Sequence, residues 1–95
     1  MEFSGKHILL AEDNDLNMEI AEFMLQNEGA VVTKTWNGQE AVEIFEKSRP
    51  DEFDVILMDI MMPVMNGYEA AKMIRSLDRE DAKTIPIIAM TANAF

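Results

Sequence analysis

The sequence lacks three features, and each absence excludes a class of protein. It has no cysteine, which excludes a disulfide framework and a thiolate metal site. Its 8 basic residues stand against 18 acidic ones, a formal net charge of −10, so we expect no nucleic acid and no anionic membrane surface as a partner of this domain. No apolar run approaches a membrane span, and the start, "MEFSGKH", lacks the apolar core of a signal peptide. A cytoplasmic location is the resulting expectation.

The chain of 95 residues is nearly half apolar, which is enough for one small domain with a core of its own. Apolar runs at residues 6–12 and 53–59 predict strands that are buried on both faces. The run "IPIIAMT", residues 85–91, predicts a fourth strand, with Pro86 near its start, where a missing N–H donor does least harm. The run at 30–35, "AVVTKT", is mixed, which indicates an edge strand.

Three helices are predicted between these strands, at residues 14–29, 37–48 and 66–78. In the first helix Asn14 or Asp15 can cap the start, and Gly29 suits the left-handed position just past the end. The stretch "REDAKT", residues 79–84, reads as a polar loop. The apolar stripes of the three helices are, in order, Leu16, Ile20, Phe23 and Met24; Gly38, Ala41, Val42 and Phe45; and Ala70, Met73, Ile74 and Leu77.

Strands and helices alternate, which predicts an α/β fold with a doubly wound parallel sheet. Crossovers between parallel strands are right-handed, and if the mixed strand is an edge, the strand order is 2-1-3-4. The chain direction then reverses between the first and third strands. Ligands of open α/β sheets bind at such a switch point, outside the carboxyl ends of the strands.

Acidic and hydroxyl residues stand at those strand ends. Glu12 and Asp13 end the first strand, Asp59 ends the third, and Thr91 ends the fourth. Three carboxylates in one crevice repel each other unless protons or a cation neutralise them. Mg²⁺ is the cation that suits this site best, because it prefers oxygen ligands. The competing interpretation is that acidic residues follow strands because they start turns.

The segments "ILLAEDN", "DVILMDIMMPVMNGYEA" and "IPIIAMTANAF" resemble the receiver domain of two-component response regulators, the CheY-like, flavodoxin-like fold. The segment "EDNDLNMEIA" looks most like the receivers of hybrid sensor histidine kinases. The resemblance implies a phosphorelay module that takes a phosphoryl group from a histidine kinase or histidine phosphotransfer domain.

The resemblance also implies a role for each matching position. Asp59 matches the phosphoacceptor, and Thr91 matches the hydroxyl residue that signals phosphorylation. Glu12 and Asp13 match the acidic pair that holds Mg²⁺ together with Asp59, and the backbone carbonyl of Met61 matches the main-chain metal ligand. Pro63 and Gly67 match the shaped loop that follows the acceptor.

The family domain normally continues through a fourth helix, a fifth strand and a fifth helix, so residues 1–95 are expected to form a receiver that is incomplete at its C-terminus. The family's lysine after the fifth strand has no counterpart, since Lys72 and Lys83 lie elsewhere. The fourth strand then has an open edge, which predicts a homodimer or an exchange of segments between chains.

Two other functions stay open at this point. The first is a non-catalytic interaction module, in which the receiver fold only binds a partner. The second is a phosphatase of the haloacid dehalogenase type, which also mounts an aspartate on a strand tip. That family requires a second aspartate two residues later, where this chain has Met61. A receiver is a self-phosphorylating acceptor rather than a conventional enzyme.

Overall fold

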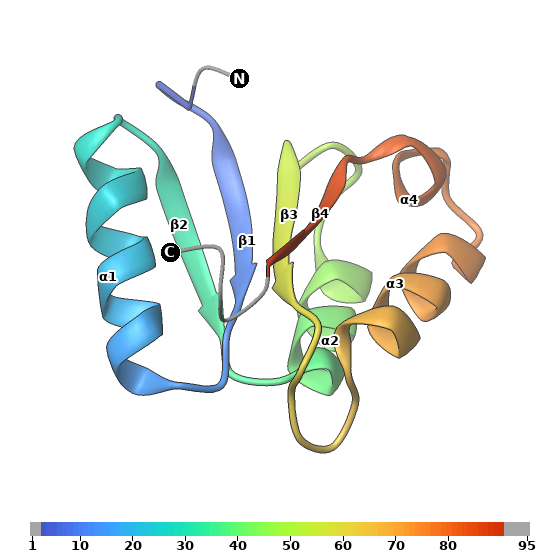
Figure 1. The fold of residues 1–95 in the computed structure, drawn as a ribbon. Helices are drawn as coiled ribbons and strands as arrows, with labels where there is room; N and C mark the ends of the chain where they lie inside the picture. The colour runs from blue at the N-terminus through green and yellow to red at the C-terminus, as the bar shows by residue number, and fades with distance from the viewer. Residues whose placement is uncertain (1–2, 91–95) are drawn as a thin grey trace.

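Four parallel strands form the sheet of the computed structural model, which describes residues 3–90. The strand order β2-β1-β3-β4 confirms the prediction and sets the switch point between β1 and β3, at the centre of the sheet (Figure 1). Thr91 lies outside the described residues, so its predicted place at the end of the fourth strand is not addressed by the structure. The strands are β1 (His7–Ala11), β2 (Val31–Thr35), β3 (Val55–Asp59) and β4 (Ile87–Met90).

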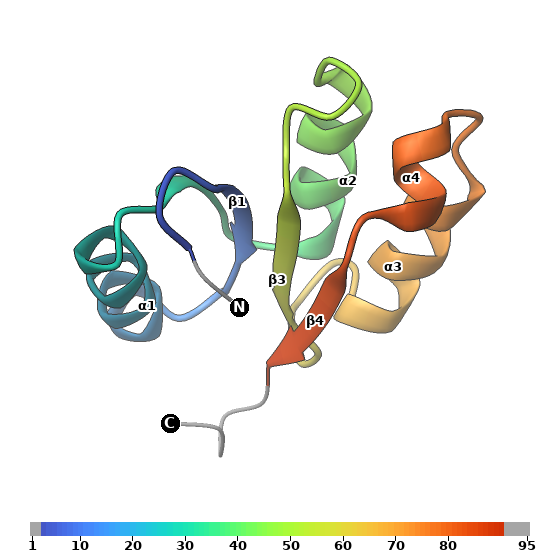
Figure 2. The same ribbon diagram turned by 90° about the horizontal axis from the view of Figure 1, so that it is seen from above.

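The helices cover the two faces of the sheet unequally. Helix α1 lies alone on one face, and α2 and α3 lie together on the other (Figures 1 and 2). Within residues 3–90, no helix combines the length and the apolar character that crossing a membrane requires. The helices are α1 (Asp15–Asn27), α2 (Gly38–Lys47), α3 (Gly67–Ser76) and α4 (Glu80–Thr84).

The central strands are buried on both faces because their side chains alternate between two apolar clusters. On β1, Ile8 and Leu10 pack in the cluster under α1, whereas Leu9 and Ala11 pack in the cluster under α2 and α3. Every residue of β3 is buried. The continuous apolar runs of the sequence therefore follow from two-sided burial, as predicted.

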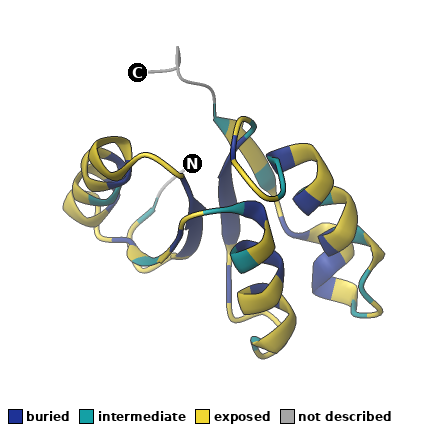
Figure 3. Ribbon diagram, turned by 90° about the horizontal axis from the view of Figure 1, so that it is seen from below, coloured by how far each residue is buried: buried dark blue, intermediate teal, exposed yellow. Residues whose placement is uncertain are grey.

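The apolar stripe predicted for the first helix does not face the sheet, so that prediction was wrong. Leu16, Ile20, Phe23 and Met24 are all exposed, and Phe23 retains 69% of its accessible surface. The buried side of α1 is instead formed by Met18, Ala21 and Leu25. Small Ala21 allows the helix to approach the sheet closely, while the larger side chains are left on the outer side, which is largely exposed (Figure 3).

The stripes of the other two helices are placed largely as predicted. All four predicted residues of α2 are buried. On α3, Ala70 and Ile74 are buried and Leu77 packs against the same cluster, but Met73 is 46% exposed and lies at the margin of the packed face.

The predicted loop at 79–84 contains helix α4, which Arg79 stabilises by contacts within this segment and with the end of α2. The Arg79 guanidinium forms an ion pair with Asp81, with an Nε–Oδ1 distance of 2.7 Å, and also donates to the carbonyl oxygens of Phe45 and Ser48 at the end of α2. Ala82 is fully buried. The polar composition of residues 79–84 therefore gave a wrong prediction of a loop, because the contacts of Arg79 stabilise a short helix there.

Each of the three longer helices begins with an asparagine cap. The side-chain oxygens of Asn14, Asn37 and Asn66 accept hydrogen bonds from the backbone N–H groups three residues later, which confirms Asn14 as the cap predicted for the first helix. Gly29, with φ of 89°, takes the left-handed conformation predicted after α1. The caps fix the loops that leave the carboxyl ends of β1, β2 and β3.

Candidate functional site

Three carboxylates meet at the switch point, as the sequence predicted. Glu12 and Asp13 follow β1, and Asp59 is the last residue of β3, the strand beside β1. One carboxylate oxygen from each of the three residues lies within 4.8 Å of the other two. Neighbouring parallel strands therefore bring Asp59 beside Glu12 and Asp13, which lie 47 and 46 positions earlier in the chain.

The three carboxylates differ in burial. Glu12 is 5% exposed and Asp59 is 9% exposed, whereas Asp13 faces solvent. The Oε1 atom of Glu12 is buried and has no hydrogen-bond partner among the described residues. Burial, and secondarily the nearby Asp59 carboxyl group, raise the pKa of Glu12 to about 7. The site thus concentrates negative charge on oxygen atoms that the protein itself satisfies incompletely.

The acceptor candidate Asp59 is held by the loop that follows it. The backbone N–H of Met61 donates to Asp59 Oδ1 over 3.1 Å, which fixes the orientation of the carboxylate. The Met61 side chain points into solvent and is 79% exposed. What Met61 offers to the site is therefore its backbone rather than its thioether.

Two glycines allow the loop between β3 and α3 to fold against its neighbours. The Gly67 N–H donates to the Ile60 carbonyl oxygen over 3.0 Å, and a Cβ atom at position 67 would lie 2.5 Å from the carbonyl oxygen of Asp59. The Gly38 N–H donates to the Met65 carbonyl oxygen over 3.1 Å, and a Cβ atom there would collide with that oxygen. The start of α2 thus supports the loop that follows Asp59.

Oxygen-only donors, two of them on rigid strand ends, fit a hard divalent cation. Mg²⁺ binds carboxylates and carbonyl oxygens and keeps several waters, so a site with a buried pair and one exposed carboxylate suits it. A carboxylate oriented by a backbone N–H can also act as a nucleophile toward phosphorus. Both kinds of chemistry are available where these three carboxylates meet.

Comparison with known families agrees with this geometry. The sequence model of the response regulator receiver domain matches residues 8–94, which is nearly the whole chain. The chain belongs to the response regulator receiver family. Its strand order is thus that of a receiver domain of two-component systems.

Relatives of this receiver domain include a histidine kinase and a response regulator. The chain is 40% identical over 93 residues to the peroxide stress-activated histidine kinase mak1 of Schizosaccharomyces pombe, covering 97% of this chain and 6% of that protein. It is 37% identical to the polar-differentiation response regulator DivK of Brucella anthropi, covering 95% of this chain and 69% of that one. The chain therefore corresponds to a small part of the kinases that it resembles.

Solved receiver structures share the fold. The receiver domain of sensor histidine kinase PA1611 from Pseudomonas aeruginosa has a TM-score of 0.84 and 43% identity, covering 97% of this chain and 71% of that one. That structure holds a magnesium ion coordinated in the active-site cleft. The chemotaxis regulator CheY4 of Vibrio cholerae has a TM-score of 0.83 at 30% identity.

Two supporting features escaped sequence reasoning. The Met61 N–H that orients Asp59 is a backbone group. Because every residue except proline has such a group, the pattern of side chains could not predict this hydrogen bond. The contact of Gly38 with the loop after β3 was hidden because Gly38 was read as part of a helix face. The "NG" pair at 37–38 was the available signal, since glycine directly after a cap permits close approach of another backbone.

Proposed function

We propose that this receiver domain accepts a phosphoryl group on Asp59 from a phosphohistidine, with Mg²⁺ bound beside it. The observation that carries the proposal is the convergence of Glu12, Asp13 and Asp59 within 4.8 Å at the switch point. The magnesium ion in the cleft of the related PA1611 receiver supports it further.

Four oxygen donors would hold the cation: the carboxylates of Glu12, Asp13 and Asp59, and the backbone carbonyl of Met61. The buried, unpartnered Oε1 of Glu12 is the observation that favours this assignment, because an orphaned buried carboxylate oxygen is costly without a cation or a proton. When bound, Mg²⁺ neutralises charge on phosphoryl oxygens.

The transfer exchanges one bond for another. An oxygen of the ionised Asp59 carboxylate attacks phosphorus, an O–P bond forms, and the P–N bond breaks with its electron pair returning to the imidazole nitrogen. The Met61 N–H keeps the attacking carboxylate oriented. Thr91 is proposed as the hydroxyl residue that senses the phosphoryl group, and it lies outside the described residues.

The phosphoryl donor is proposed to be a histidine kinase or a histidine phosphotransfer domain. Support comes from relatives named as histidine kinases, such as mak1 and hybrid signal transduction histidine kinase I of Dictyostelium discoideum, which is 37% identical over 90 residues. A contact between two copies of the chain through the β4 edge is a separate proposal, because β4 hydrogen-bonds only with β3 among the described residues.

Acetyl phosphate with Mg²⁺ tests the acceptor role. We expect the intact mass to increase by one phosphoryl group in the native chain and in Asp78→Asn, which changes an exposed aspartate at the far end of α3. Asp59→Asn is expected to gain none. A folded native chain that gains no phosphoryl group would instead favour the non-catalytic interaction module.

A further inference from the structure

The side chain of Trp36 joins the segment after β2 to the start of helix α1. Its indole Nε1–H donates to Asp15 Oδ1 over 3.0 Å, although the two residues are 21 positions apart in the chain. Trp36 is the only tryptophan of the sequence, and it retains 38% of its accessible surface. A tryptophan that is this exposed and donates to a carboxylate holds a partner rather than filling a core.

The partner of Trp36, Asp15, ends the stretch that carries the two acidic residues after β1. At the start of this stretch, the Glu12 N–H donates to the Thr35 carbonyl oxygen over 3.0 Å. At its end, Asp15 accepts the hydrogen bond from Trp36. The Asp13 side chain between these two contacts faces solvent, so its position depends on the backbone that carries it. The segment after β2 therefore holds residues 12–15 at both ends.

Trp36 is itself fixed by helix α2. Its backbone N–H donates to Glu40 Oε1, on the first turn of that helix, over 3.0 Å. Two residues after Trp36, the Gly38 N–H donates to the Met65 carbonyl oxygen in the loop that follows Asp59. Residues 35–40 thus contact both the loop after β1 and the loop after β3, which are the two loops at the carboxylate cluster.

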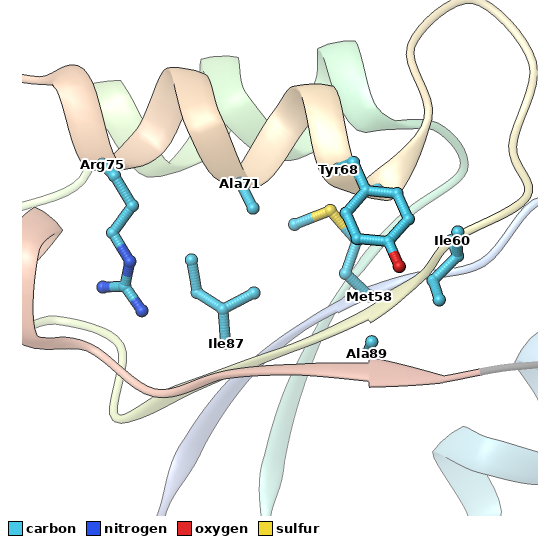
Figure 4. A pocket seen from close by; sticks show the side chains of 8 residues that line it. Met58, Ile60, Tyr68, Ala71, Arg75, Ile87 and Ala89 are labelled. Carbon is cyan, nitrogen blue, oxygen red and sulfur yellow. The ribbon is translucent and has the colours of Figure 1, made fainter.

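The contacts that lead from Asp15 to Met65 do not involve β4. A pocket of about 240 Å³ lies between β4 and α3, and the side chains of Ile60 and Tyr68 are among those that line it (Figure 4). Neither Gly38 nor Met65 lines that pocket. The link between the two loops therefore depends on β1, β2 and α2, whose ends are all among the described residues.

We propose that Trp36 is a positioning residue of the cation site: its indole N–H holds Asp15 and thereby the backbone of Asp13. The inference rests on the proposed function, in which Asp13 is one of the ligands of Mg²⁺. Asp15 is not a member of the cluster of three carboxylates that lie within 4.8 Å of one another, so it acts as an anchor for the loop. Without this anchor the loop must be ordered when the cation binds, and the lost conformational entropy weakens binding.

A titration with MgCl₂, followed by the backbone amide NMR signals of residues 12, 13 and 59, tests the proposal without phosphoryl transfer. Trp36→Phe keeps an aromatic ring and removes the donor, so we expect its dissociation constant for Mg²⁺ to be about three- to tenfold higher than that of the native chain. Asp15→Ala should have a similar effect, and the double variant no larger one, because all three lack the same hydrogen bond.

Two variants control for the charge of Asp15. Asp15→Asn keeps an oxygen that can accept from the indole, and Glu19→Gln removes a charge from an exposed position one turn further along α1. Both dissociation constants are expected to stay within about twofold of the native value, since exposed charges are screened. An Asp15→Asn variant that binds Mg²⁺ as weakly as Asp15→Ala does would overturn the proposal, because charge alone would then explain the loss.

Melting temperatures in EDTA and in millimolar Mg²⁺ separate positioning from stability. We expect Mg²⁺ to raise the melting temperature of Trp36→Phe less than that of the native chain, because the variant binds the cation more weakly. A purely structural role would lower both melting temperatures of Trp36→Phe equally and leave its dissociation constant native, which would overturn this inference alone. A native chain whose NMR signals do not respond to Mg²⁺ would overturn this inference and the proposed function together.

Discussion

A carboxylate as deeply buried as that of Glu12 destabilises a fold unless a cation or a proton neutralises it. Its Oε1 atom has no partner within residues 3–90, and its pKa is raised to about 7 by burial and by Asp59. Glu12 directly follows β1, which fixes its backbone at the carboxyl end of the sheet. At the scale of single residues, the fold therefore sacrifices some stability to keep this buried carboxylate at the switch point.

The exchange Glu12→Gln tests this view of the site. The variant keeps the shape of the side chain and removes its charge, so we expect a melting temperature at pH 8 without Mg²⁺ equal to or above that of the native chain. Millimolar Mg²⁺ should raise the melting temperature of the native chain and raise that of Glu12→Gln much less. Equal magnesium-dependent shifts in both proteins would show that Glu12 does not hold the ion.

Val64 illustrates strain in the loop that follows Asp59. Its φ is 68°, a conformation that a β-branched residue rarely adopts, and its side chain is 80% exposed. We expect Val64→Gly to increase the free energy of unfolding by about 0.5 to 1 kcal/mol, because glycine adopts this conformation without strain. Val31→Gly, in an extended strand, should decrease it. Urea denaturation measures both changes, and a destabilised Val64→Gly would refute this explanation.

At the scale of secondary-structure elements, α1 has apolar residues on two sides. Met18, Ala21 and Leu25 pack on the sheet, and the larger set on the other side remains exposed. Periodicity alone identified the exposed set, because those residues are large and regularly spaced. The choice between two apolar sides depends on the fit to the sheet, which no single helix sequence encodes.

Two substitutions on α1 distinguish its sides. Leu25→Ala is expected to decrease the free energy of unfolding by about 2 to 4 kcal/mol, since it leaves a cavity in the cluster under α1. Phe23→Ala should change it by no more than about 0.5 kcal/mol, although phenylalanine is the larger residue. Comparable losses in the two variants, measured by chemical denaturation, would mean that Phe23 is also packed.

The sequence predicted most of the elements because buried strands and capped helices leave strong local patterns. The strands, the strand order, the three longer helices and the meeting of Glu12, Asp13 and Asp59 were predicted correctly. Helix α4 was missed because it is stabilised by contacts of Arg79 with residues more than 30 positions away. Interactions of that range cannot be inferred from the composition of a six-residue segment.

The Arg79–Asp81 pair gives the fold a defined acid sensitivity. The Arg79 guanidinium, chiefly through its hydrogen bonds, lowers the pKa of Asp81 to about 2, so the ionised carboxylate favours the folded state. Its contribution is complete above the ordinary carboxyl pKa and is lost as the pH falls toward about 2. We expect the difference in unfolding free energy between the native chain and Asp81→Asn to be constant above about pH 5 and to shrink below pH 4. A difference that does not change with pH, measured by urea denaturation, would contradict this role.

At the scale of the whole molecule, the parallel sheet explains why the three carboxylates lie together at the carboxyl ends of its strands. All four strands point the same way, so their carboxyl ends share one rim, and the chain reverses direction there between β1 and β3. Glu12, Asp13 and Asp59 stand at this rim. The fold thus joins a rigid sheet to the loops that follow its strands.

The most direct test of the central claim is transfer from a phosphorus–nitrogen donor to Asp59. Phosphoimidazole, which reproduces the donor bond of a phosphohistidine, would be incubated with the native chain and with Asp59→Asn, each with Mg²⁺ and with excess EDTA. Intact-mass measurement should show one added phosphoryl group in the native chain with Mg²⁺ and none in the other three samples. A phosphoryl group on Asp59→Asn, or none on a folded native chain supplied with Mg²⁺, would contradict the account.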